Sequence, residues 1–111
     1  MVKIYWDNRK TLYLYAEGHA GAGKKGEDPV CAGISTLLFT LEETLRQVQT
    51  VGFSHLEPGY AEFCIEKTSE TNPLFSFTLT GLHILAAVYP EHLCLTNFPD
   101  AERKAKSQTA R

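Results

Sequence analysis

One stretch of the sequence, residues 18–35, limits how the chain can fold more than any other. It reads GHAGAGKKGEDPVCAGIS. Within it, Asp28-Pro29 is a strong helix start, because aspartate caps free N–H groups and proline suits the first helical position. A predicted strand ends just before His19, so a strand, a loop and a helix follow one another closely. We therefore expect His19 at a strand end and Cys31 in the first turn of a helix.

The segment between these two residues is rich in glycine. Gly18 ends the predicted strand, and Gly21, Gly23 and Gly26 follow within residues 20–27. Glycine loosens a backbone and allows positive φ angles, and a packed core gives no reason to keep so many of them together. Such loops are either plain connectors or mobile covers over functional sites. We expect a mobile loop here.

The rest of the sequence predicts the strands and helices that hold this stretch in place. Alternating apolar residues predict an antiparallel hairpin of residues 2–7 and 11–17. The first helix is predicted to run from Pro29 to about Thr50 and to be closed by Gly52. After a linker containing Pro58-Gly59, residues 60–67 predict a strand, with Glu62, Cys64 and Glu66 on its partly solvated face. Asn72-Pro73 predicts a second helix that ends at Tyr89, before a short last strand over residues 92–98.

The predicted order is β-β-α-β-α-β, which gives an α/β fold of the α+β type. We expect a small antiparallel sheet of about four strands with two helices packed on one face. Residues 1–98 would form a single domain, and residues 99–111 a disordered, charged tail. The second helix is apolar nearly all round and contains Gly81, which predicts a close backbone approach and cover on more than one side. We therefore expect a homodimer.

Composition narrows the class of function. The chain has 111 residues and a net charge of −2, so it lacks a basic field for binding nucleic acid. Its cysteines, Cys31, Cys64 and Cys94, are odd in number and far apart, which argues against a disulfide framework or a structural zinc site. The N-terminus shows no apolar signal segment. We expect a cytoplasmic protein with no membrane partner, no metal and no cofactor.

Four interpretations of residues 18–35 remain open on the pattern alone. The first is nucleophilic catalysis. A helix N-terminus and a neighbouring imidazole both stabilise the thiolate form of a cysteine, and free N–H groups there could hold an oxyanion, so the pattern suits acyl transfer. Gly18-x4-Gly23-Lys24 resembles a phosphate loop, but Lys25 stands where Ser or Thr must hold magnesium. A metal site with His55, His83 or His92 fits no ligand template. In the fourth interpretation, Cys31 is an ordinary residue of the hydrophobic core. On the pattern alone, this interpretation is favoured over the other three.

A resemblance changes that balance. The stretch resembles the bacterial ribosomal-processing cysteine proteases, the Prp family. The matching residues are Gly18-His19-Ala20, the glycine-bearing loop, Asp28, Val30-Cys31-Ala32-Gly33 and Ser35. Gly81-Leu82 and Tyr89-Pro90 also look like the end of the family's second helix, so the resemblance covers most of residues 1–98.

The resemblance implies a Cys-His endopeptidase that removes the N-terminal extension of large-subunit ribosomal protein number twenty-seven. It also implies a small α/β sandwich, a homodimer, Cys31 as nucleophile and His19 as general base. Asp28 and Ser35 match supporting positions, and the glycines form a cover over the cleft. Pro29 departs from the branched aliphatic residue expected there, which affects loop motion. The alternative is a non-catalytic peptide-binding or ribosome-associated module with the same fold.

Overall fold

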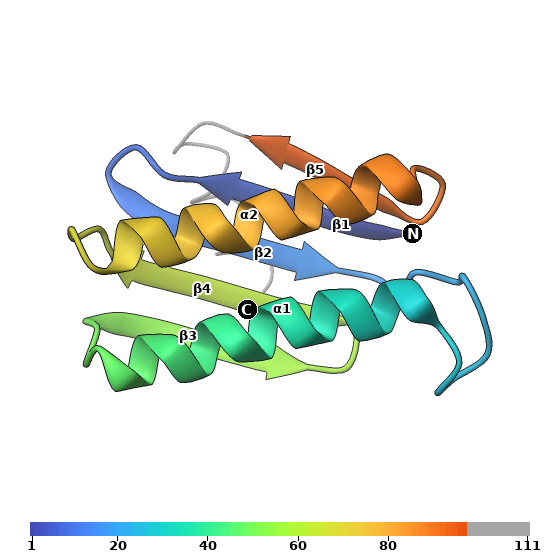
Figure 1. Ribbon diagram of the computed structural model, residues 1–111, viewed down its shortest axis with the longest axis horizontal. Coiled ribbons are helices and arrows are strands. Elements are labelled where there is room, and N and C mark those ends of the chain that lie inside the picture. Colours follow the sequence, from blue (N-terminus) through green and yellow to red (C-terminus); the bar gives the residue numbers. More distant parts are fainter. Residues whose placement is uncertain (98–111) are drawn as a thin grey trace.

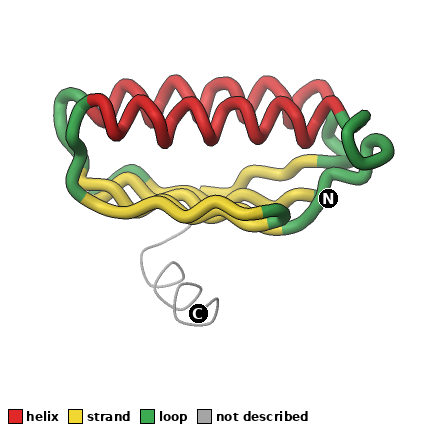
Figure 2. The backbone as a smooth tube through the Cα atoms, turned by 90° about the horizontal axis from the view of Figure 1, so that it is seen from below, coloured by secondary structure: helices red, strands yellow, loops and turns green. Residues whose placement is uncertain are grey.

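The computed structural model describes residues 1–97, which form a five-stranded sheet and two helices. Figure 1 shows the helices running side by side, and Figure 2 shows both on the same side of the sheet. The molecule therefore has two layers. The tail expected over residues 99–111 lies outside the described residues. In chain order the elements are β1 (Val2–Asp7), β2 (Thr11–Glu17), α1 (Pro29–Gln47), β3 (Gly52–Glu57), β4 (Tyr60–Glu66), α2 (Thr71–Val88) and β5 (Leu93–Asn97).

The α+β class is confirmed, but the sheet differs from the expected one in strand number and direction. Its order is β3-β4-β2-β1-β5, and β5 pairs parallel with β1 while the other neighbours are antiparallel. Residues 52–57, expected as part of a linker, form β3, which the Pro58-Gly59 turn joins to β4. The chain then crosses over through α2, and such a crossover brings β5 back parallel to β1. The sheet thus has one strand more than the expected four or so, and one parallel pair in a sheet that was expected to be antiparallel throughout.

The helix boundaries also need correction. Helix α1 ends at Gln47, short of Thr50, and the left-handed backbone conformation that follows it falls on Gln49, with a φ of 53°. Gly52 therefore does not close the helix but begins β3. Helix α2 begins at Thr71, and Asn72 lies inside it. The Thr68 hydroxyl oxygen accepts the N–H of Thr71 at 3.0 Å, so threonine takes over the cap expected from Asn72.

The core lies between the helices and the inner face of the sheet. Helix α1 buries Ile34, Leu38, Leu41 and Leu45, which are spaced as predicted for its apolar face. Full burial of one such side chain contributes about 1.5–3 kcal/mol. The helices approach each other closely, as predicted at Gly81: a Cβ atom there would lie 2.8 Å from Leu37 Cδ2.

The outer face of the sheet is less solvated than its pattern predicts. Glu62 and Tyr13 point away from the helices, yet they are only 1% and 2% exposed. The Tyr13 hydroxyl donates to Glu62 Oε2 at 2.9 Å, which satisfies part of the buried carboxylate. Of the other residues on this face of β4, Cys64 is half-buried and Glu66 is exposed, as expected. Neither described helix is both long and apolar enough to cross a membrane.

Candidate active site

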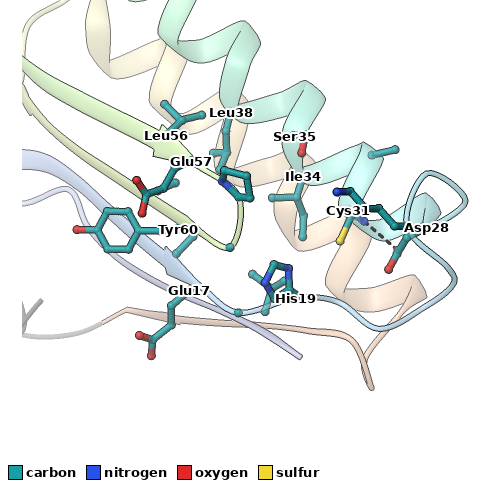
Figure 3. A pocket seen from close by; sticks show the side chains of 18 of the residues that line it. Glu17, His19, Asp28, Cys31, Ile34, Ser35, Leu38, Leu56, Glu57 and Tyr60 are labelled. Atoms are coloured by element: carbon teal, nitrogen blue, oxygen red, sulfur yellow. Dashed lines mark hydrogen bonds between the residues drawn. The ribbon is translucent and has the colours of Figure 1, made fainter.

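His19 and Cys31 line the same cleft, as the sequence predicts. Strand β2 ends at Glu17, two residues before His19, and Cys31 is the third residue of α1. The cleft has a volume of about 820 Å³ and lies between the end of β2, the first turns of α1, the glycine-rich loop and the β3–β4 turn. Figure 3 shows the sulfur of Cys31 and the ring of His19 at the same end of it. A thiol and an imidazole are therefore both accessible to a molecule in the cleft.

The N-terminus of α1 is occupied by its own cap. Asp28 Oδ1 accepts the N–H groups of Val30 and Cys31, both at 3.0 Å, while Pro29 has no N–H. The N–H of Ala32 donates to the Asp28 carbonyl oxygen, also at 3.0 Å. The expectation that these N–H groups are free to hold an oxyanion is therefore wrong for this conformation, because the carboxylate that caps the helix already uses them.

Asp28 also holds the loop. Its second carboxylate oxygen, Oδ2, accepts the N–H of Ala22 at 2.9 Å, so one side chain ties residue 22 to the helix. These bonds lower the pKa of the Asp28 carboxyl below its usual value. The N–H of Cys31 contributes most, and the N–H of Ala22, the thiol of Cys31 and the N–H of Val30 add to it against a smaller desolvation penalty. With its oxygens engaged in this way, Asp28 does not orient His19.

His19 is held by contacts that the sequence analysis did not predict. Its ring packs against Gly59 in the β3–β4 turn, where a Cβ atom would lie 2.8 Å from His19 Nε2. The N–H of Gly18 donates to the Gly59 carbonyl at 3.0 Å, and His92 Nδ1 donates to the Ala20 carbonyl at 2.8 Å. Pro58-Gly59 between two alternating segments is a hairpin signal that could have revealed the turn. No sequence signal indicates the contact of His92.

The described residues contain no hydrogen bond between the His19 ring and the Cys31 sulfur. Because catalytic hydrogen bonds often form only with substrate in place, this does not exclude a pair acting together. The Cys31 sulfur and the His19 ring therefore share the cleft, but they are not aligned for proton transfer in this conformation.

The supporting residues of the sequence analysis divide into three groups. Gly21, Gly23 and Gly26 line the cleft, and Gly21 and Gly26 have positive φ angles of 69° and 85°. Gly18, at a φ of 104°, lies so close to the Met1 carbonyl that a side chain would clash with it. Ser35, one turn after Cys31, is exposed on the cleft wall. The cleft floor is apolar, with Ile34, Leu38 and Leu56 in line, as Figure 3 shows.

The other interpretations of the stretch gain no support. Among residues 1–97, no group of three or more His, Cys, Asp or Glu side chains is arranged to hold a metal ion. Cys31 is half-buried at the edge of the core and reaches the cleft, so it is not an enclosed packing residue. A thiol, an imidazole and an apolar groove suit nucleophilic attack on a bound polypeptide.

Comparisons with known proteins agree with this geometry. A profile of the family described as "Cysteine protease Prp" matches residues 1–94. The ribosomal processing cysteine protease Prp of Mycoplasma genitalium is 32% identical over 97 residues, which cover 86% of this chain and 94% of that protein.

Two solved structures have the same fold. The essential ribosomal processing protease Prp of Staphylococcus aureus, solved with a covalently linked product peptide, aligns with a TM-score of 0.77 at 21% identity, covering 87% of this chain and 97% of that one. A Streptococcus mutans protein aligns with a TM-score of 0.75 at 27% identity, covering 88% of this chain and 94% of that one.

Proposed function

The chain belongs to the cysteine protease Prp family, and we propose that it removes the N-terminal extension of large-subunit ribosomal protein number twenty-seven by Cys-His catalysis. The observation that carries this proposal is the position of Cys31 and His19 in one cleft of about 820 Å³. Family membership favours an enzyme over a non-catalytic module. A ribosomal substrate also fits a cytoplasmic location and the reduced state of the three cysteines.

The reaction is acyl transfer in two steps. The Cys31 sulfur, as thiolate, attacks the scissile carbonyl carbon, and the carbonyl oxygen becomes an oxyanion. His19 then gives its proton to the leaving amine, and the carbon–nitrogen bond breaks to leave a thioester on Cys31. Water, deprotonated by His19, attacks the thioester and releases the acid product and the thiolate. A dyad is sufficient for these steps, since Asp28 is engaged elsewhere.

Asp28 must release Cys31 before the oxyanion can be stabilised. The same carboxylate caps the N–H of Cys31 and holds the loop through Ala22. We infer that substrate entering the cleft displaces the Asp28 side chain. This frees the N–H of Cys31 for the oxyanion and, in the same movement, frees the loop to close over the substrate.

The proposed enzyme is a homodimer formed through the outer side of α2. Phe77, Ile84 and Val88 lie along one side of this helix at helical spacing and are 78%, 60% and 63% exposed. Ile84 also lines a groove between α1 and α2, whose lining includes the small residues Gly33 of α1 and Gly81 of α2, and these would allow close approach of a second helix. Apolar residues this exposed mark interaction surfaces when they adjoin.

The experiment that tests the function is incubation of the protein with a peptide spanning the ribosomal protein's N-terminal extension. Mass spectrometry should detect a single cut at the end of the extension, and Cys31→Ala should prevent it. Binding of the peptide without any cut by the wild-type protein would contradict the proposal. Cleaved N-termini in cells with and without the protein would then identify the natural substrate.

A further inference from the structure

The backbone is held by hydrogen bonds on both sides of His19. Before it, the N–H of Gly18 donates to the Gly59 carbonyl at 3.0 Å. After it, the carbonyl of Ala20 accepts a hydrogen bond from His92 Nδ1 at 2.8 Å. Ala20 is only 2% exposed, and the glycine-rich loop starts with it. His92 therefore acts at the junction between the backbone of the imidazole and the loop.

His92 is itself fixed in the connection between α2 and β5. Its N–H donates to the Tyr89 carbonyl at 3.0 Å, and its carbonyl accepts the N–H of Val2 at 2.9 Å. Strand β5 begins at the next residue and pairs with β1. Figure 1 shows the start of β5, the end of β2 and the loop before α1 at the same end of the molecule. The donor that reaches Ala20 is therefore attached to the sheet and not to the loop.

The ring of His92 is the donor in this contact, because a carbonyl oxygen can only accept. Nδ1 therefore carries a proton, and the neutral ring has its hydrogen on Nδ1 and not on Nε2. The side chain lies outside the lining of the cleft. His92 thus acts on a substrate through the backbone that it holds, which would make it a positioning residue and not a catalytic one.

Gly21 is the first position after Ala20 that can absorb a movement of the loop. It has a φ of 69°, and a Cβ atom there would meet nothing within 4 Å. Hinges consist of a few such residues, which take up the change in backbone angles when a loop closes. The next held group is the N–H of Ala22, which Asp28 releases in the proposed mechanism. This release lets the loop turn about Gly21 while His92 keeps Ala20 in place.

We propose that His92 is a positioning residue that holds the backbone of His19 and Ala20 while the glycine-rich loop moves over the substrate. This inference rests on the proposed function, in which His19 gives a proton to the leaving amine. Displacement of a catalytic group by about 1 Å can lower a rate about a hundredfold. A loop that pulled on His19 as it closed would cause such a displacement. With Ala20 held, the imidazole approaches Cys31 by rotation of its own side chain.

The test removes the donor and keeps a ring. His92→Phe has no ring N–H, whereas His92→Asn places an amide N–H close to the position of Nδ1. The control is His83→Phe, because His83 Nδ1 also donates to a backbone carbonyl at 2.8 Å, that of Leu79 within α2. Cleavage is measured with the peptide that spans the ribosomal protein's extension, and thermal unfolding of each variant gives its folded fraction.

We expect His92→Phe to lower kcat roughly tenfold and to change KM less than about twofold, because the cleft stays intact while the imidazole is displaced. The loss is partial, since the Met1 nitrogen still donates to the His19 carbonyl at 2.8 Å. His92→Asn should recover most of kcat, and His83→Phe should keep it. An equal loss of kcat in His83→Phe, or no recovery in His92→Asn, would overturn the proposal.

NMR gives a second readout, which does not depend on cleavage. The amide order parameters of residues 19 and 20 should be about 0.85 in the wild type and in His92→Asn, and should fall toward about 0.6 in His92→Phe. Order parameters that His92→Phe leaves unchanged would contradict the proposal. If the wild type cuts no peptide, the proposed function fails, and the order parameters alone decide whether His92 holds this backbone.

The wild-type ring of His92 provides a check that holds even if His92→Phe does not fold. Its nitrogen chemical shifts should show the proton of the neutral ring on Nδ1. A neutral ring protonated at Nε2 alone could not donate to Ala20, and this result would also overturn the proposal.

Discussion

The carboxylate of Asp28 accepts the N–H of Cys31 at 3.0 Å, so the proposed nucleophile has its own backbone donor occupied before substrate arrives. The second oxygen of the same carboxylate holds the N–H of Ala22. The Asp28 side chain therefore contacts both the first turn of α1 and the glycine-rich loop. Replacements at residue 28 can remove one contact and keep the other.

Asp28→Asn should free the loop and keep the helix cap. The amide oxygen of asparagine can still accept the N–H groups of Val30 and Cys31, but its NH₂ group cannot accept the N–H of Ala22. We expect hydrogen exchange of residues 20–27 to be roughly tenfold faster while the first turn of α1 keeps its protection. In the control Asp28→Ala, both segments should exchange faster. An unchanged loop in Asp28→Asn would show that the contact with Ala22 does not hold it.

The loop should also be released by acid. The pKa of Asp28 is lower in the folded protein than in the unfolded chain, where it is about 3.9. Its contribution to stability is therefore complete above about pH 4 and is lost as the pH falls through the lower, folded value. Loop protection, corrected for intrinsic exchange, should stay constant from neutral pH to about 4 and fall in stronger acid. Asp28→Asn should lack this acid dependence.

Replacement of Cys31 by Ala or Ser should abolish peptide cleavage, with a loss of roughly a thousandfold or more because the attacking atom is removed or weakened. His19→Ala should have a comparable effect. Cys64→Ala and Cys94→Ala should keep most of the activity, since both side chains lie on the outer face of the sheet. Iodoacetamide at neutral pH should label Cys31 first. Equal labelling of the three thiols would argue against an activated Cys31.

Gly59→Ala should lower kcat more than it changes KM. The new methyl group would meet the His19 ring at 2.8 Å and push it from its place, and displacement of a catalytic group by about 1 Å can cost tenfold or more in rate. Gly52→Ala is the matched control, because Gly52 also has a positive φ and no space for a side chain, but it meets the backbone of β4. It should lower thermal stability and keep kcat in the folded fraction. Equal kcat losses in the two variants would contradict a specific role for Gly59.

Phe77→Glu should convert the proposed dimer into a monomer. A charge on the exposed apolar side of α2 would have to be desolvated on association. Light scattering at micromolar concentration should give twice the monomer mass for the wild type and the monomer mass for the variant. Val51→Glu, also at an exposed apolar position but away from α2, should remain dimeric. A wild-type protein at monomer mass would remove the dimer from the proposal.

The parts of the fold that the sequence predicts are those set by local chemistry. The start of α1 follows from Asp28-Pro29, and the β1–β2 hairpin follows from strict alternation. The position of β5 could not be predicted in this way, because its pairing with β1 joins the two ends of the described chain. Strand β3 was missed for another reason: its residues are mostly exposed at the sheet edge, so its apolar pattern is weak.

In the candidate site, too, the features set by local sequence could be predicted and those set by distant contacts could not. His19 and Cys31 are close in sequence, and their positions follow from one strand end and one helix start. The contact of Gly59 with His19 depends on the pairing of β2 with β4, which no local pattern reveals. The hydrogen bond from the Cys31 N–H to Asp28 depends on side-chain geometry, which the sequence does not reveal. The sequence predicts Asp28 as a helix cap, but a capping carboxylate also occupies the N–H groups that an oxyanion would need.

His92 contacts the carbonyl of Ala20 across 72 residues of sequence, and β5 follows immediately after it. During synthesis, the side chains of His19 and Cys31, which we propose as catalytic, therefore leave the ribosome long before His92, which fixes the backbone beside the imidazole. Contacts so distant along the chain form late, because a long loop must close first. A nascent chain of this kind would carry the two proposed catalytic groups unaligned until His92 and β5 have been made, which would delay cutting until then.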